Sequence, residues 1–286
     1  AIEMKKVTKN KLLISKIEEV VLKPIGYAQF LGTHKLEVNR ERVFLPEKSL
    51  KTTIRILHLS DFHASGVVPY KFIDRAVELG ISCQPDIICL TGDYATHFIP
   101  KPVDQYKNIL AKLPAFAPTF ASFGNHDMCY ASNNGKRYLD TIHVGKLLED
   151  SGIDVLVNEE RTVSIRNQQI RITGLADVYS RMMNPGKILS KNGNVPREPV
   201  VVLSHNPDSK SFLKNYYWDL LLCGHTHGGQ CNLPYIGPLL TPVIDKRYLE
   251  GLHQWQGRWI HITRGVGNVH GVRINCRPQV SIIEIS

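Results

Sequence analysis

The 286-residue sequence has no apolar run that approaches the roughly 20 residues a helix needs to span a bilayer. It also has no Cys-x-x-Cys pair among its six cysteines, and both Cys89 and Cys223 lie inside apolar runs. Cysteines in such positions are most simply buried small hydrophobic residues. A secreted fold held together by disulfides is therefore not expected, and the sequence favours a reducing compartment. The sequence shows no internal repeat and no low-complexity tract, which argues against a repeat architecture.

The sequence has few acidic residues relative to basic ones: it contains 26 Asp and Glu and 35 Lys and Arg, which gives a formal net charge of +9. This excess favours an anionic partner, such as a phosphate-rich substrate, an acidic membrane surface or nucleic acid. A basic surface that is simply solvated is the alternative. Aromatic residues are not interleaved with Lys and Arg as a base-stacking platform would require, so we do not expect nucleic acid as a partner. The hydrophobic content of 43% is ordinary for a globular domain with a full core.

The first fifty residues differ from the rest of the chain in composition. Lysines punctuate a stretch whose apolar residues recur at helical spacing: Leu13, Ile17, Val20 and Val21. This pattern predicts a basic amphipathic helix on a membrane surface, or else a helix docked on the domain with its lysines solvated. We therefore divide the chain into an N-terminal segment, residues 1–50, and a domain, residues 51–286. The sequence starts without an initiator methionine, and one interpretation is that an anchor segment once preceded Ala1.

From residue 54 onward, short apolar runs alternate with helical patterns. Residues 54–59 and 86–91 are strand-like, and the helical stripe between them ends at Gly80, which predicts a β-α-β unit. Further strands are predicted at 118–123, 200–204, 219–223, 260–263 and 280–285, and a helix at 138–148. Residues 162–173 alternate around a short polar turn and predict a hairpin. The domain is therefore expected to be of the α/β class.

Polar residues cluster where five of the predicted strands end: Asp61-Phe62-His63, Asp93, Asn125-His126-Asp127, His205 and His225-Thr226-His227. Loops at strand ends are where open α/β sheets build their binding sites. A single Asp or His in such a place often caps a helix or occupies a turn. Five clusters that supply Asp, Asn and His are hard to explain as turns, and we interpret them as one site.

The chemistry of these side chains points to metal ions. Carboxylate, amide and imidazole ligands without thiolate suit Mn²⁺, iron or Zn²⁺. They are too many for one tetrahedral ion, whereas two ions roughly 3.5–4 Å apart that share a carboxylate would use them all. Asp93 is the natural bridge, because a carboxylate can offer one oxygen to each ion. We expect the glycines around the ligands to let the backbone turn sharply: Gly92, Gly124, Gly224, Gly228 and Gly229.

At these residues the sequence resembles the calcineurin-like metallophosphoesterase superfamily. All five blocks occur in the family's order, and the resemblance covers roughly residues 54–286. Residues 224–230, 239–242, 264–267 and 275–278 further resemble a bacterial subgroup of small, membrane-associated phosphodiesterases. The resemblance implies a metal-dependent phosphohydrolase of the α/β class, with a four-layer α/β/β/α sandwich of two mixed sheets.

The family pattern also implies a role for each site residue. It assigns one metal ion to Asp61, His63, Asp93 and His227, and the other to Asp93, Asn125, His205 and His225. His126 would be the proton donor or the electrostatic partner of the transition state, and Asp127 would orient its ring. The two ions would most simply be Mn²⁺, with iron or zinc as alternatives. Arg264, at a strand end beside the site, is a candidate phosphate contact, and a surface ion pair is its alternative.

Motifs of this kind define a reaction class rather than a substrate. Over its whole length the chain most resembles the chlamydial-type UDP-2,3-diacylglucosamine pyrophosphohydrolases of lipid A synthesis. This implies a lipid-linked nucleotide as substrate, with UMP and 2,3-diacylglucosamine 1-phosphate as products. It also implies a place at the cytoplasmic face of the bacterial inner membrane, either peripheral on the anionic surface or tethered by a segment absent from this chain.

Three other functions fit parts of the pattern. A generic phosphodiesterase or phosphatase would share every metal motif, and only a panel of substrates would separate it. A nuclease of the same superfamily would explain the positive charge but lacks the aromatic platform noted above. A non-catalytic scaffold would be expected to have lost ligands, and every expected ligand is present here together with His126.

Overall fold

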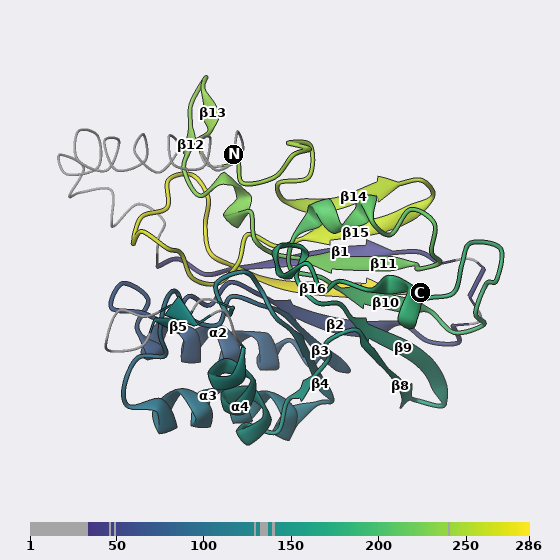
Figure 1. The fold of residues 1–286 in the computed structure, drawn as a ribbon, viewed down its shortest axis with the longest axis horizontal. Helices are drawn as coiled ribbons and strands as arrows, with labels where there is room; N and C mark the ends of the chain where they lie inside the picture. Colours follow the sequence, from purple (N-terminus) through teal and green to yellow (C-terminus); the bar gives the residue numbers. More distant parts are fainter. Residues whose placement is uncertain are drawn as a thin grey trace.

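The computed structural model describes residues 34–45, 47–48, 50–128, 130–131, 137–138, 141–239 and 241–286. Its core is a pair of six-stranded sheets (Figure 1). The first sheet contains, in spatial order, β1 (Glu37–Val43), β16 (Gln279–Ile285), β2 (Ile54–Leu59), β3 (Ile87–Thr91), β4 (Thr119–Ser122) and β7 (Asp154–Val155). The second contains β14 (Gly251–Trp255), β15 (Arg258–Ile262), β11 (Leu220–Cys223), β10 (Val200–Leu203), β9 (Gln168–Gly174) and β8 (Glu159–Ile165).

Both sheets are mixed, and their parallel strands form the centre of each. In the first sheet β2, β3, β4 and β7 run parallel while β16 is antiparallel to β2. In the second, β9, β10, β11 and β15 run parallel, and β8 and β14 are antiparallel at the two edges. The predicted hairpin at 162–173 is the β8–β9 pair. Parallel neighbours bring their carboxyl ends to one edge, which is where the ligand-bearing loops begin.

Side-chain alternation along the strands separates the core into three apolar layers. On β2, Ile54 and Ile56 pack between the two sheets, together with Ile172 of β9 and Val201 of β10. Residues of the opposite parity, such as Leu57, pack against the helices outside the first sheet. A third cluster lies outside the second sheet. The period of two in the apolar pattern therefore fixes which face of each strand looks toward the other sheet.

Three α-helices cover the outer face of the first sheet: α2 (Tyr70–Ser82), α3 (Val103–Phe116) and α4 (Ile142–Asp150) (Figure 1). Outside the second sheet, the described chain supplies loops and short 3₁₀ turns, among them η5 (Pro207–Ser211), with Leu213 and Trp218 as the packing residues. The expected α/β fold of two packed mixed sheets is confirmed. The fourth layer is thinner than the four-layer description implies, because 3₁₀ turns and loops take the place of long helices there.

Several local expectations differ from the structure. The helix after β2 does not end at Gly80 but continues to Ser82, and Gly80 is there for packing, because an added Cβ would lie 2.7 Å from Leu57. The predicted helix at 138–148 is α4, which begins at Ile142. The predicted amphipathic segment at Leu13–Val21 lies outside the described residues. Within the remainder of the N-terminal fifty residues, β1 is an integral strand that pairs with β16. In the described part of the chain, every helix is too short or too polar to cross a bilayer.

Candidate metal centre

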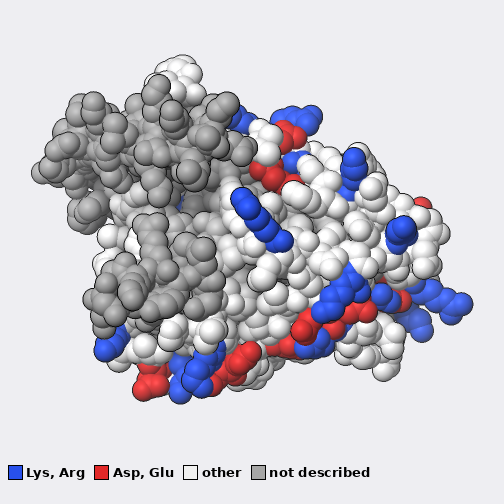
Figure 2. Space-filling view, viewed as in Figure 1, with Lys and Arg blue, Asp and Glu red and all other residues white. Residues whose placement is uncertain are grey.

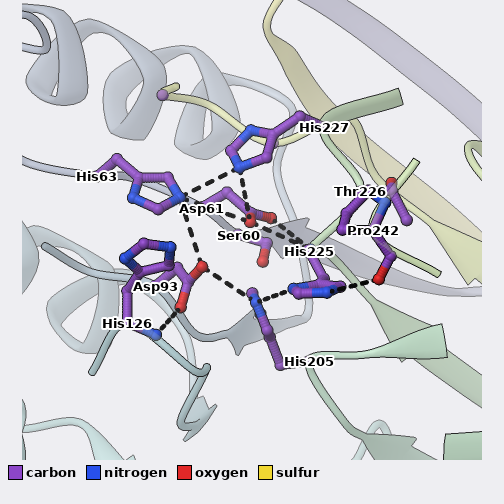
Figure 3. A network of polar contacts seen from close by, with 12 residues as sticks. Ser60, Asp61, His63, Asp93, His126, His205, His225, Thr226, His227 and Pro242 are labelled. Carbon is purple, nitrogen blue, oxygen red and sulfur yellow. Dashed lines mark hydrogen bonds and ion pairs between the residues drawn. The ribbon is translucent and has the colours of Figure 1, made fainter. Parts of the chain in front are cut away.

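The five polar clusters predicted from the sequence meet at one edge of the paired sheets (Figure 3). Asp61 and Asp93 follow β2 and β3 of the first sheet, and His205 and His225 follow β10 and β11 of the second. Burial is nearly complete for these side chains, with His225 the most accessible at 9%. The site is therefore assembled from both sheets, and neither sheet alone would hold it.

The backbone at the ligands is unusual. Five of the predicted ligands have a positive φ in the left-handed region: Asp61 (53°), His63 (45°), Asp93 (58°), His225 (71°) and His227 (51°). Residues with a Cβ rarely adopt this conformation, and each instance costs on the order of 1–3 kcal/mol. Such strain persists only where the surrounding structure enforces it. Here the left-handed backbone conformation directs the side chains of these five residues toward a common point.

The first ligand cluster consists of Asp61, His63 and His227. The Nε2 atoms of His63 and His227 are 3.1 Å apart, and Nε2 of His227 lies 3.4 Å from Oδ1 of Asp61. Oδ2 of Asp93 lies 3.4 Å from Nε2 of His63. The ligand atoms of Asp61, His63 and His227 all lie within 4.8 Å of one another, close enough to contact a single ion.

The second cluster consists of Asp93, His205 and His225. The same Oδ2 of Asp93 lies 3.1 Å from Nε2 of His205, which lies 3.2 Å from Nδ1 of His225. Asp93 is thus next to a histidine of each cluster, which is the bridging place expected from its chemistry. The Oδ1 atom of Asn125 is buried without a hydrogen-bond partner among the described residues, as expected of an oxygen that binds a cation.

The outer hydrogen bonds of two histidines fix which nitrogen faces the site. Nδ1 of His205 donates to the carbonyl of Thr91 at 2.6 Å, and this leaves Nε2 as the inward lone pair. Nε2 of His225 donates to the carbonyl of Pro242 at 3.2 Å, and this leaves Nδ1. Metal-bound histidines are held in this way by backbone carbonyls. The donor set of oxygens and imidazole nitrogens, buried and oriented, fits a pair of divalent cations.

The buried carboxylates and imidazoles of the site differ in the direction in which their pKa values are shifted. Burial would raise the pKa of Asp93, but the neighbouring His205, His126 and His63 together hold it well below the usual value. Burial lowers the pKa of His205, and the charge of Asp93 more than reverses this, so the pKa of His205 lies well above its usual value. Burial raises the pKa of Asp61 to about 6, against the opposing charge of His205. Bound divalent cations would stabilise both carboxylates in their charged form.

Two of the glycines serve a purpose other than the sharp turn expected of them. Gly124 and Gly224 do not have a positive φ. A Cβ on Gly124 would lie 2.3 Å from Oδ1 of Asp93, and a Cβ on Gly224 would lie 2.2 Å from Oδ2 of Asp61. These glycines make room for the ligand carboxylates. The turn explanation holds for Gly92, whose φ is +90°.

His126 lies beside the clusters, with its ring centroid 4.9 Å from that of His63. Its backbone N–H donates to Oδ1 of Asp93, and its ring Nδ1 donates to the carbonyl of Thr96 at 2.9 Å. Thr96, rather than Asp127, therefore orients the ring. Asp127 instead accepts three backbone N–H groups, those of Asp93, Tyr94 and Gly124, at 2.7–2.8 Å. Burial raises the pKa of Asp127 to about 8, with the charge of Asp93 adding to the effect. Its role is to hold the loops of two ligands together.

Arg264 follows β15, and its side chain lies against Gly228, where an added Cβ would be 2.7 Å from Cγ of Arg264. It is paired with Glu37 at 3.1 Å and with Glu250 at 3.4 Å, and it also donates to Gln279. These contacts are the ion pairs weighed as the alternative for Arg264, and its role as a phosphate contact stays a prediction. The fully buried arginine at the site is Arg273, which the sequence reasoning missed.

Arg273 has no motif that marks it, and neither do the carbonyls of Thr91, Thr96 and Pro242. Every residue has a backbone carbonyl, so the identity of a residue does not reveal whether its carbonyl accepts a hydrogen bond from the site. Tyr179 was missed as well: its ring is 57% exposed and lies 5.8 Å from the ring of His225. An exposed aromatic ring next to buried histidines marks the rim of the site, and only the fold brings the two together.

Two clusters of metal-ligating side chains, with the Asp93 carboxylate next to a histidine of each and an oriented imidazole beside them, define a dinuclear metallohydrolase site. Residues 54–229 match the family model for calcineurin-like phosphoesterases. The chain therefore belongs to the calcineurin-like phosphoesterase family, and it is a metal-dependent phosphohydrolase. The predicted superfamily is thus confirmed.

Relatives within the family have different named activities. The chain is 38% identical over 260 residues to phosphodiesterase YaeI of Escherichia coli (strain K12), which covers 91% of this chain and 92% of the relative. It is 28% identical to the uncharacterized metallophosphoesterase YkuE of Bacillus subtilis (strain 168), covering 91% and 89%. It is 26% identical to the UDP-2,3-diacylglucosamine pyrophosphatase LpxG of Chlamydia trachomatis serovar D, covering 90% and 91%. The expected likeness to the chlamydial-type enzymes exists, but identity to YaeI is higher.

Proposed function

We propose that this protein cleaves the pyrophosphate bond of a lipid-linked nucleotide, UDP-2,3-diacylglucosamine, to give UMP and 2,3-diacylglucosamine 1-phosphate. The observation that carries the reaction class is the placement of Asp93 between the two ligand clusters. The similarity to LpxG over nine-tenths of both chains supports the substrate. We further propose Mn²⁺ as the physiological ion, and the cytoplasmic face of the inner membrane as the location.

The chain's own residues have separate tasks in this reaction. When bound, two divalent cations would supply Lewis acidity at phosphorus and lower the pKa of the attacking water. Asp61, His63, Asp93, Asn125, His205, His225 and His227 would hold the ions. His126, with Nδ1–H donating to the Thr96 carbonyl, would donate from Nε2 to the leaving oxygen in its protonated, imidazolium form. The exposed ring of Tyr179 offers a face on which the uracil base would stack.

Turnover of UDP-2,3-diacylglucosamine by the purified chain with Mn²⁺ in detergent, beside bis-p-nitrophenyl phosphate, tests the proposal. We expect metal-dependent release of UMP that is abolished by Asp93→Ala together with loss of bound metal. Asp104→Ala is the matched control, because the Asp104 carboxylate is 87% exposed on α3. Turnover of the model diester alone would preserve the metal centre and overturn the substrate.

A phosphodiesterase with a different substrate is the second candidate, and the identity to YaeI favours it. The two candidate functions use the same metal centre. They differ only in the groups that the substrate carries on either side of the scissile phosphate. A panel of nucleotide diesters and diphosphates with and without acyl chains separates them. Preference for an acyl-free diester would favour this second candidate.

A further inference from the structure

Exposed apolar side chains gather at the edge that holds the metal centre. Among the described residues, Val67 (45% exposed) follows β2 and Phe98 (55%) follows β3, while Tyr235 (108%), Ile236 (72%) and Ile244 (90%) follow β11. All five lie on loops that begin at the carboxyl ends of strands. Large exposed apolar patches on one face of a soluble domain mark interaction sites.

Two of these side chains, Tyr235 and Ile236, lie at the tip of a small hairpin formed by β12 (Asn232–Leu233) and β13 (Gly237–Pro238). In Figure 1 this hairpin projects beyond the two sheets, and in Figure 2 its tip is free of charged side chains. Tyr235 and Ile236 connect its two strands. The tip is thus an uncharged projection of aromatic and aliphatic surface.

The base of the hairpin is fixed to the ligand loop. It follows the 3₁₀ turn η6 (His227–Gly229) after only two residues, and a Cβ on Gly229 would lie 2.3 Å from Cβ of Pro238. Leu239 donates its N–H to the carbonyl of Cys231 at 3.0 Å, which closes the hairpin. Asn275 donates its side-chain amide to the carbonyl of Asn232 at 3.0 Å. The orientation of the tip is therefore set by the same loop that presents a metal ligand.

Charge around the hairpin is arranged for an anionic surface. Residues 228–244 include no Asp, Glu, Lys or Arg, in a chain of which 21% of the residues are charged. Asp245, Lys246 and Arg247 follow this stretch, and Arg247 pairs with Asp245 at 2.8 Å. Lys246 is exposed there, and Arg277 is exposed beside the loop that braces β12, so these two residues supply the flanking positive charge. An uncharged apolar tip with cations at its flanks fits a lipid surface. The tip can reach the acyl boundary while the cations remain at the level of the anionic headgroups.

We propose that the β12–β13 hairpin docks the metal-centre edge of the protein on a bilayer of anionic phospholipid. Tyr235 lies at the headgroup level, where amphipathic rings are favoured, and Ile236 reaches the acyl boundary. The flanking cations contact the lipid phosphates. This inference goes beyond the proposed function, because docking does not depend on which phosphate ester is cleaved. It gives a function to the exposed apolar tip of the hairpin.

Flotation of the full chain with vesicles of phosphatidylglycerol, compared with vesicles of phosphatidylcholine, tests the docking. We expect binding to the anionic vesicles that the double variant Tyr235→Ser/Ile236→Ser weakens about tenfold or more. Phe44→Ser is the control, because Phe44 is 66% exposed beyond the end of β1, at the opposite edge of the sheet. Turnover of bis-p-nitrophenyl phosphate, measured in parallel without vesicles, should be unchanged in both variants.

Each other outcome would contradict the docking. Undiminished binding of the double variant would move membrane contact to another part of the chain, such as the lysine-rich N-terminal segment. Loss of diester turnover in the double variant would make the hairpin part of the reaction site. A dimer that becomes a monomer on substitution, measured by sedimentation, would assign the tip to a second copy of the chain. Failure of the proposed substrate would leave vesicle binding unaffected, so the two ideas fail separately.

Discussion

The guanidinium of Arg273 lies against the outer side of a predicted metal ligand, with Nη2 3.3 Å from Nδ1 of His227. Arg273 is completely buried and also donates to backbone carbonyls of the loops around the site, among them that of Arg264 at 2.6 Å. It contacts the carbonyl of His227 itself at 3.3 Å. A single side chain thus ties the ligand loop at His227 to the loop that follows β15.

We expect Arg273→Met to weaken metal binding and to lower stability. Arg273 positions the ligand loop through the carbonyl of His227, and outer groups that position a ligand typically contribute 10–100-fold to metal affinity. Each buried carbonyl left without a donor also costs about 1–3 kcal/mol. Isothermal titration of the metal-stripped protein with Mn²⁺ and thermal unfolding measure the two effects. Arg273→Lys keeps the charge but fewer donors, so it should fall between Met and the unaltered chain. Full metal affinity in Arg273→Met would refute the role assigned to this contact.

Replacement of His126 by alanine should reduce turnover by about 10²–10⁴-fold while metal content stays at two ions. The contact between His126 and Asp93 uses the backbone N–H, so removal of the ring leaves that hydrogen bond in place. Elemental analysis and steady-state kinetics on the same preparation check both parts. Loss of metal in this variant would show that the ring also supports the ligands.

Substitution of Tyr179 tests whether the exposed ring at the rim contacts the nucleotide. Base–aromatic stacking contributes about 1–3 kcal/mol, so Tyr179→Ala should weaken competitive inhibition by UMP about tenfold, with kcat little changed. Tyr179→Phe keeps the ring and should retain the inhibition constant. Equal inhibition of the alanine variant would remove Tyr179 from the binding site.

A buried histidine pair that is not part of the metal centre should make stability depend on pH. Nδ1 of His58 lies 3.0 Å from Nδ1 of His261, and together they join β2 of one sheet to β15 of the other. Burial, with the charge of His261, lowers the pKa of His58 well below 6.5, and burial lowers that of His261 to about 3. In the unfolded chain both would titrate near 6.5, so between that pH and about 3 the unfolded state binds more protons.

Acid therefore destabilises the folded state through these two histidines. Stability is full above the unfolded pKa of 6.5 and falls as the pH drops below it, by at most about 1.4 kcal/mol per pH unit for each histidine. His261→Gln should reduce this slope relative to the unaltered chain in urea unfolding series at matched metal content. Identical slopes for the two proteins would mean that the pair is not protonated differently on unfolding.

The meeting of the metal-centre side chains at one place could be predicted from sequence, because the clusters that carry them follow strand ends. Asp61, Asp93, His205 and His225 follow apolar runs short enough to be recognised as strands, and parallel pairing then brings them to one edge. The fold class follows from the same runs. What could not be predicted is any contact made through the backbone: the carbonyls of Thr91 and Thr96 orient His205 and His126, and no residue identity encodes them.

Buried polar residues outside the motifs could not be placed from the sequence for a related reason. His58 and His261 match no pattern, and a histidine on the inner face of a strand cannot be distinguished from one on the surface until the partner strand is known. Arg264 and Arg273 are nine residues apart, and the sequence favoured the first as a site residue. Position after a strand drew attention to Arg264, whereas burial, which only packing reveals, belongs to Arg273.

The pairing of β1 with β16 has a consequence for the direction in which the chain enters the domain. Glu37 pairs with Gln279, at the edge where β2 delivers Asp61, so the polypeptide enters the domain on the same side as the metal centre and the β12–β13 hairpin. The start of β1 and the proposed docking hairpin can therefore face one surface at the same time. A contact of each with that surface would then strengthen the other through effective concentration, instead of acting as an independent affinity.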